Sequence, residues 1–192
     1  MAEDRGNWAL LLHGGAGFIT RSRLSAEQDR AYRTSLAAAA EAGAAVLRRQ
    51  GSAVDAVEAA VRCLEDDPLF NSGRGAAFTA DGRNELDASI MDGSTRAAGA
   101  VAGVRNARNP VSLARAVMER SPHVLLAGEG ADAFAREAGV ELADASWFFT
   151  ETRWRSLIHL LEKHGQPLPS RPVPESAHAR VDHLAHDEGV RG

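Results

Sequence analysis

The sequence feature that most restricts the fold is a continuous apolar run, Trp8 to Leu12, which leads directly into the glycine-rich motif His13-Gly14-Gly15-Ala16-Gly17. An apolar run without alternation is typical of a strand that is buried on both faces. Such a strand needs a layer of structure on each side. We therefore expect a layered fold in which the glycine-rich motif lies at the end of a strand.

Helical and strand patterns alternate along the rest of the chain. Helices are expected over residues 25–50, 52–65, 110–120, 131–138 and 151–163. The first begins with a capping box, in which Ser25 is followed three residues later by Gln28, and Asn109 before Pro110 marks the start of the third. Strands are expected over residues 76–79, 86–91, 98–104 and 123–126, the first two forming a hairpin around Asp81-Gly82-Arg83-Asn84.

This alternation predicts a mixed α/β class packed in layers, without deciding the order of the strands. The periodic pattern stops at Lys163. From His164 onward the chain holds four of the seven prolines and four of the seven histidines. We expect one domain over residues 1–163, followed by a flexible linker over residues 164–192.

Composition narrows the class of function. An apolar fraction of 44% with 25% charged residues is that of a globular protein, which excludes disordered and fibrous classes. Twenty-two basic against 26 acidic residues give a net charge of -4, so no basic field attracts nucleic acid or an anionic membrane. No signal-peptide pattern or apolar run of membrane length is present. A cytoplasmic protein that acts on a small solute is the expectation.

Three motifs carry the functional signal. They are His13-Gly14-Gly15-Ala16-Gly17, then Pro68-Leu69-Phe70-Asn71-Ser72-Gly73-Arg74-Gly75-Ala76, then Glu85-Leu86-Asp87-Ala88-Ser89-Ile90-Met91-Asp92-Gly93. In this order, and followed by a tail that closes on Asp187-Glu188-Gly189-Val190-Arg191-Gly192, they resemble the α subunit of plant-type L-asparaginases, also called isoaspartyl peptidases. Members of that family are N-terminal nucleophile hydrolases, made as one precursor that cuts itself between a Gly and a Thr. The resemblance spans essentially the whole chain.

The resemblance implies a four-layer αββα sandwich, in which residues 1–163 supply one part of both sheets and a separate β subunit supplies the rest. It implies hydrolysis of L-asparagine to L-aspartate and ammonia, and cleavage of β-aspartyl dipeptides. The nucleophile would be the Thr that follows Gly192, so this chain would hold no catalytic residue of its own. The mature enzyme would be a dimer of αβ heterodimers that needs no organic cofactor.

The first motif allows the backbone to pass close to another group, since glycine has no side chain. A dinucleotide-binding loop would need a third glycine and a following helix, and an α/β-hydrolase would need a Gly-x-Ser-x-Gly elbow, none of which is present. A tight turn without function remains the alternative. In the asparaginase family this loop lies against the threonine nucleophile. The resemblance thus gives a supporting role to the loop residues and the cleavage site: His13, Gly14, Gly15, Gly17 and Gly192.

The second motif follows a helix end and a tight glycine path, so unpaired carbonyl groups that point inward are expected to form a cation site. The resemblance implies a structural Na+ held by main-chain oxygens of Leu64, Glu65, Asp67, Phe70, Ser72 and Arg74. Relatives can carry an aliphatic residue where this chain has Arg74, a change that a main-chain ligand tolerates.

Asn71 has a separate implied role in the second motif. By the resemblance, its amide donates to the oxyanion that forms during self-cleavage. The alternative is a turn asparagine that bonds to its own loop.

Three further residues have structural interpretations. Asp87 and Asp92 lie five residues apart on one expected strand, so they point to opposite faces and do not form an acid–base pair. They are expected to be framework hydrogen-bonding groups. The single cysteine, Cys63, lies in an apolar run and is expected to be a small buried hydrophobic residue.

Other functions remain as alternatives. A glycosylasparaginase-type hydrolase is the nearest, and a non-enzymatic protein whose glycine loop binds an anion or a small metabolite comes from a different class. An α/β-hydrolase fragment would need a serine elbow downstream. A zinc site at His183 and His186 would need rigid spacing and further ligands, so a solvated tail is the expectation there.

Overall fold

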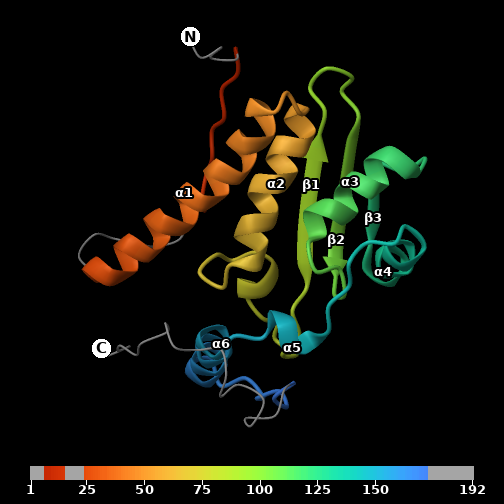
Figure 1. Cartoon of the computed structure of the whole chain (residues 1–192). Coiled ribbons are helices and arrows are strands. Elements are labelled where there is room, and N and C mark those ends of the chain that lie inside the picture. Colours follow the sequence, from red (N-terminus) through yellow and green to blue (C-terminus); the bar gives the residue numbers. More distant parts are fainter. Residues whose placement is uncertain (1–6, 16–23, 173–192) are drawn as a thin grey trace.

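The computed structural model describes residues 7–15 and 24–172. The first two helices form a hairpin at one side of the molecule (Figure 1). Helix α1 (Ala26–Arg48) begins with the expected capping box, in which Ser25 Oγ accepts from the Gln28 amide at 3.1 Å. Helix α2 (Ala53–Asp66) has a second capping box, formed by Ser52 and Asp55. Gly43 allows the close approach, since a Cβ there would lie 2.9 Å from the Ala56 carbonyl oxygen.

A three-stranded sheet in the order β1-β2-β3 lies beside the hairpin. Strand β1 (Leu86–Met91) pairs antiparallel with β2 (Ala98–Val104), and β2 pairs parallel with β3 (Leu125–Ala127). Helix α3 (Pro110–Arg120) connects β2 to β3 and covers one face of the sheet, and α4 (Gly128–Glu137) follows β3. The main core lies between α3 and the sheet. Its buried residues include Leu86, Ile90, Val101, Val104, Leu113 and Val117.

Gly99 permits α3 to pack tightly on β2. A Cβ at this position would lie 2.1 Å from the Ala114 carbonyl oxygen and 2.5 Å from the Met118 amide nitrogen. We expect Gly99→Ala to lower the free energy of unfolding by about 1–3 kcal/mol, as overpacking does. Urea unfolding of the full-length protein measures this, with Gly93→Ala as the control, because a Cβ at Gly93 meets nothing within 4 Å. Equal stability of the two variants would show that α3 and β2 have room to move apart.

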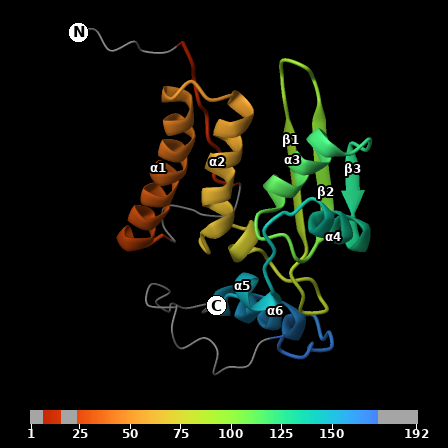
Figure 2. The same cartoon turned by 45° about the vertical axis from the view of Figure 1, so that its right-hand side comes forward.

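A second, smaller core forms at the end of the molecule that carries α5 (Ala145–Phe148) and α6 (Glu151–Lys163), as Figure 2 shows. Its buried residues come from α6 and the segment before it, and Phe78 packs against them from the loop after η1 (Gly73–Gly75). The Phe78 ring meets the Phe149 and Trp154 rings edge to face, with centroids 5.6 and 5.3 Å apart. This cluster joins the last described helix to the segment that follows the second motif.

The face of the sheet opposite α3 carries small and exposed residues. Along β1 the side chains alternate, so Leu86 and Ile90 are buried while Ser89 and Met91 are exposed. On β3, Leu125 pairs with Ala100 on this same open face and is 55% exposed. Apolar residues at this level of exposure on a sheet face are typical of a surface that another layer covers.

Two strand expectations are wrong. Trp8 to Leu12 forms no strand, Leu11 is 95% exposed, and Leu12 packs against the buried cluster that includes Phe70. The physical reason is that a strand needs a hydrogen-bonding neighbour, and the described residues offer none to this segment. Residues 76–79 do not form a hairpin with 86–91 either. The expected turn does form, since Phe78 and Asn84 make an isolated antiparallel bridge and the Thr79 amide donates to the Arg83 carbonyl oxygen at 2.8 Å. Strand β1 turns through Asp92 to pair with β2 instead.

The other elements follow the expectations with small shifts. The fourth and fifth expected helices appear as α4 and α6, and α6 ends at Lys163 as expected. The proposed linker over residues 164–192 lies outside the described residues from position 173 onward. None of the helices in the described part is both long and apolar enough to cross a membrane.

Candidate functional site

The first motif lies against the second. A Cβ on Gly14 would lie 2.7 Å from Leu36 Cδ2 and 3.3 Å from Phe70 Cε1, so only glycine fits this contact without displacing a neighbour. The next residue, Gly15, has a φ of +115°, which favours glycine, and its amide donates to His13 Nδ1 at 3.2 Å. Gly17 lies outside the described residues. The structure therefore brings His13, Gly14 and Gly15 next to the loop that carries Asn71.

Asn71 is fixed at one end of its side chain. Its Oδ1 accepts from the Ala77 amide at 2.8 Å, which closes the loop from residue 71 to residue 77. Within the described residues the Asn71 amide nitrogen donates no hydrogen bond, and the residue is exposed. This geometry is compatible with both interpretations of Asn71, as a turn residue and as an oxyanion donor. The oxygen bonds to its own loop, while among the described residues the nitrogen remains available to donate.

Phe70, next to Asn71, is anchored in a third cluster of buried residues. It packs with Ala39 and Leu64, and the Tyr32 ring meets it edge to face at 5.9 Å. The Tyr32 hydroxyl also donates to the Leu69 carbonyl oxygen at 3.4 Å. The position of Asn71 is therefore determined by contacts from α1 and α2.

The six carbonyl groups implied as sodium ligands fall into two sets. Those of Leu64, Asp67 and Ser72 accept backbone hydrogen bonds of 3.1–3.4 Å. Within the described part of the chain, no backbone hydrogen bond is made to the other three: Glu65, Phe70 and Arg74.

Two glycines give these carbonyl groups room. Gly73 has a φ of +52°, and a Cβ on it would lie 2.2 Å from the Glu65 carbonyl oxygen. A Cβ on Gly75 would lie 2.0 Å from the Phe70 carbonyl oxygen. Carbonyl groups without hydrogen-bond partners on a tight loop fit a hard cation such as Na+.

The side chain of Glu65 is the most unusual titratable group of the loop. It is 1% exposed, and its Oε1 accepts from the Val111 amide at 3.0 Å. Among the described residues neither its Oε2 nor the buried Asn109 Oδ1 has a hydrogen-bond partner. Burial raises the pKa of Glu65 to about 8, so the carboxyl group is mainly protonated at neutral pH. Sequence reasoning assigned only the main chain of Glu65 and missed this buried acid.

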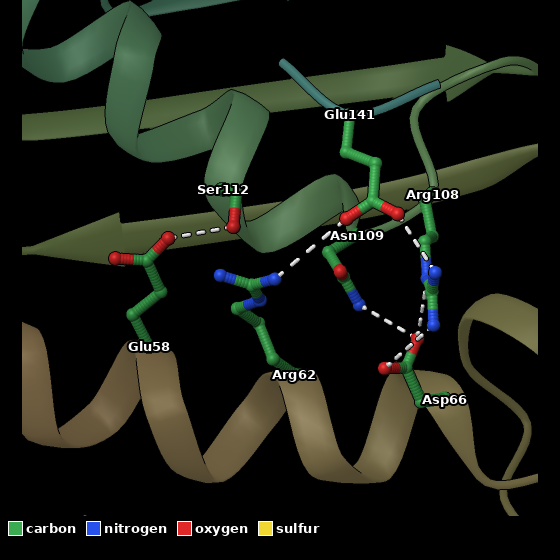
Figure 3. A network of polar contacts seen from close by, with 7 residues as sticks. All are labelled: Glu58, Arg62, Asp66, Arg108, Asn109, Ser112 and Glu141. Carbon is green, nitrogen blue, oxygen red and sulfur yellow. Dashed lines mark hydrogen bonds and ion pairs between the residues drawn. The ribbon is translucent and has the colours of Figure 1, made fainter. Parts of the chain in front are cut away.

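A polar network joins α2 to α3 beside the loop (Figure 3). Glu58, Arg62 and Asp66 are spaced four residues apart and share one side of α2. Glu58 accepts from the Ser112 hydroxyl at 2.6 Å, and Arg62 lies 3.9 Å from Glu141. Asp66 accepts from Arg108 and from the Asn109 amide at 3.2–3.4 Å. The four-residue spacing on α2 was the one sequence signal that could have predicted this network.

The third motif lies outside the Asn71 loop, and its two aspartates form hydrogen bonds within the sheet and the turn that follows β1. Asp87 Oδ1 accepts from the Gly103 amide at 2.8 Å across β1 and β2. Asp92 caps the turn after β1, where the Ser94 hydroxyl and amide lower the pKa of its carboxyl group. Both aspartates therefore act as hydrogen-bonding groups of the framework in this structure.

Cys63 is not buried as expected. It lies on the exposed side of α2, while Ala60 and Leu64 occupy the buried side. The residues considered for a zinc site, His183 and His186, lie outside the described residues. In the part that is described, no cluster of three or more His, Cys, Asp or Glu residues could hold a metal ion.

Comparison with known proteins assigns the chain to a family. A sequence model described as asparaginase matches residues 6–188. The isoaspartyl peptidase of Escherichia coli is 46% identical over 173 residues, which cover 86% of this chain and 54% of that protein. The isoaspartyl peptidase of Salmonella typhimurium is 50% identical over 78% of this chain, and a plant-type L-asparaginase of Thermococcus kodakarensis is 46% identical over 82%.

The chain spans about half the length of the curated relatives it matches, from 43% to 54%. The matched region contains all three motifs, including the Gly14 and Asn71 loops that meet in the structure. The chain therefore belongs to the asparaginase family.

Proposed function

We propose that this chain is the α portion of an amidohydrolase that converts L-asparagine to L-aspartate and ammonia and cleaves β-aspartyl dipeptides. The observation that carries the proposal is the contact between the Gly14 loop and the Phe70-Asn71 loop in a member of the asparaginase family. The amide nitrogen of Asn71, which donates to no other group among the described residues, supplies a donor of the kind that stabilises an oxyanion. Relatives at 46–50% identity bear the names isoaspartyl peptidase and L-asparaginase, which supports this substrate class.

The proposed reaction begins with self-cleavage after Gly192. The hydroxyl of a following Thr adds to the Gly192 carbonyl carbon, and the oxyanion that forms accepts a hydrogen bond from the Asn71 amide. The C–N bond breaks, so the acyl group moves from nitrogen to oxygen and frees the Thr amine. Water then hydrolyses the ester and leaves two chains. Glycine at position 192 suits this step because it accepts a strained backbone and leaves room for attack.

Turnover repeats the same chemistry on the substrate. The Thr hydroxyl attacks the side-chain amide carbon of asparagine, or the β-linked carbonyl carbon of an isoaspartyl dipeptide, while its own α-amine takes the proton. Ammonia or the trailing amino acid leaves, and water releases aspartate from the ester. The groups that grip the substrate's α-carboxylate and α-amine are assigned to the β portion.

The open face of the sheet supports the proposed quaternary structure. Ser89, Met91 and Leu125 lie on the side away from α3, where a second sheet would bury them. A four-layer αββα sandwich would be completed by a separate β subunit, and two αβ units would form the mature heterotetramer. Trp8 to Leu12 would then gain the strand partner that it lacks in the described residues.

A structural Na+ is part of the proposal, held by the carbonyl groups of residues 64–74. We expect replacement of NaCl by choline chloride to lower the free energy of unfolding by roughly 1–2 kcal/mol, which shifts the melting temperature by several degrees. Calorimetry of the full-length protein in both salts measures this. Gly73→Ala places a Cβ on the Glu65 carbonyl oxygen and should remove the difference between the salts. A melting temperature that is the same in both salts for the native sequence would contradict the site.

The activity test uses the processed full-length protein. Ammonia release from L-asparagine and amino acid release from a β-aspartyl dipeptide are both expected, with N-acetylglucosaminyl-asparagine hydrolysed poorly. Preference for the glycosylated substrate would favour the glycosylasparaginase-type alternative. Hydrolysis of none of the three would contradict the proposed function and favour a binding protein.

A further inference from the structure

Two guanidinium groups lie over the ring of Trp147 of α5. Arg108 Cζ lies 4.2 Å from the centroid of its ring, and Arg74 Cζ lies 5.0 Å from it. Both distances are within the range of cation–π attraction. The half-buried Trp147 also packs against the main core, and its indole N–H has no hydrogen-bond partner among the described residues. Stacking and packing, rather than a hydrogen bond, therefore hold this ring.

The two arginines differ in how firmly they are held. Arg108 pairs with Asp66 at the end of α2 and with Glu141, so the Trp147 ring contacts an anchored cation. Arg74 lies in η1, inside the loop between Asn71 and Ala77. Trp147 thus connects a fixed point to the loop. An aliphatic side chain at position 74 could not make this cation–π contact. The guanidinium group of Arg74 therefore adds an attachment of the loop to Trp147.

Arg153 of α6 holds the same loop at a second point. Its Nε donates to the Gly75 carbonyl oxygen at 2.8 Å, across 78 positions of sequence. Helix α6 is itself fixed by its Thr150 cap and by the packing of Trp154 on Phe78, which follows the loop. Figures 1 and 2 both place α5 and α6 below the end of α2, where this loop runs.

We propose that Trp147 and Arg153 are positioning residues that hold the loop of residues 71–77 so that the Asn71 amide nitrogen points toward the reacting carbonyl group. Neither side chain touches substrate. Trp147 contacts the Arg74 side chain, and Arg153 binds the carbonyl group of the next residue, Gly75. The hydrogen bond from the Ala77 amide to Asn71 Oδ1 then couples the position of the loop to that of Asn71. This role rests on the proposed function.

The test compares four single variants of the full-length protein. Trp147→Leu and Arg153→Met remove the contacts, Trp147→Phe keeps an aromatic face, and Arg155→Met changes an exposed arginine of the same helix. We expect the first two to slow self-cleavage and lower kcat about 5- to 20-fold with KM within twofold. Trp147→Phe should recover most of the rate, and Arg155→Met should match the native sequence. Native rates in both Trp147→Leu and Arg153→Met would overturn the proposal.

A double variant separates positioning from general destabilisation. In the Asn71→Ala background, Arg153→Met should cause no further slowing, because the loop no longer carries the donor that it positions. A further 5- to 20-fold loss in that background would show that Arg153 acts elsewhere and would overturn the proposal.

Hydrogen exchange at the Ala77 amide gives a readout independent of activity. Trp147→Leu and Arg153→Met should speed it at least about fivefold, and Arg155→Met should not. Protein that never self-cleaves would end the proposed function, while the exchange rates would still decide whether these residues hold the loop.

Discussion

Replacement of Asn71 by Ala should slow self-cleavage of the full-length protein by about 100- to 1,000-fold, the usual effect of removing one oxyanion donor. The amide nitrogen of Asn71 has no other acceptor among the described residues, so the amide group is already oriented for this role by the Ala77 bond to its oxygen. A donor held before the reaction stabilises the developing charge without reorganisation. The first-order rate constant for conversion of precursor into two chains, followed by denaturing gel or mass spectrometry, measures the effect.

A matched variant separates the donor from the loop contact. Asn71→Asp keeps an oxygen that accepts from the Ala77 amide and removes the N–H donor. It should therefore be at least as slow as Asn71→Ala, while its melting temperature stays within a few degrees of the native value. Cleavage of Asn71→Asp at the native rate would show that Asn71 is a turn residue and that another group stabilises the oxyanion.

The second large effect is a fall in stability as pH rises, caused by Glu65. Burial raises the pKa of this carboxyl group from its ordinary value of 4.5 to about 8. Because the folded pKa lies above the unfolded one, the favourable contribution is complete below about pH 4.5 and is lost as pH rises through about 8. The difference between these values corresponds to about 5 kcal/mol at most, since each pH unit is worth about 1.4 kcal/mol.

Glu65→Gln should remove most of this dependence. Glutamine resembles the protonated acid, since its oxygen can accept from the Val111 amide and its nitrogen can donate to Asn109 Oδ1, which has no partner in the described part of the chain. Urea unfolding between pH 5 and 9 measures the slope, in choline buffer so that no cation near the Glu65 carbonyl group offsets the carboxylate charge. The native protein should lose stability over this range while the variant stays nearly constant. Equal slopes in the two proteins would contradict a buried neutral acid.

Local signals predicted most of the helices and the central strands. Ser25 with Gln28 and Asn109 with Pro110 define helix starts through neighbours within three residues, so no distant contact was needed to find α1 and α3. The prediction of a strand over Trp8 to Leu12 was wrong, because an apolar run indicates only that a segment tends to be buried. Whether it becomes a strand depends on a hydrogen-bonding neighbour that the sequence of the segment does not encode.

Only those site residues that belong to a continuous sequence motif could be predicted from the sequence. The glycines at 14, 73 and 75 are part of continuous patterns. The structure shows the close contacts that favour glycine there, with side chains at Gly14 and with main-chain atoms at Gly73 and Gly75. Trp147 and Arg153 are single residues about 75 positions away from the loop they contact, with no pattern around them. The neutral state of Glu65 likewise follows from burial between α2 and α3, which a helical pattern with an acidic residue does not reveal.

On the proposed function, residues 1–192 are the α portion of a self-cleaving hydrolase. The most direct test is to express the entire reading frame and determine the intact masses of the denatured product, together with the N-terminal sequence of any second fragment. The expected products are a fragment of about 20 kDa that ends at Gly192 and a partner that begins with Thr. A single uncut polypeptide that remains intact through prolonged incubation, or a cut at another position, would contradict the proposed function.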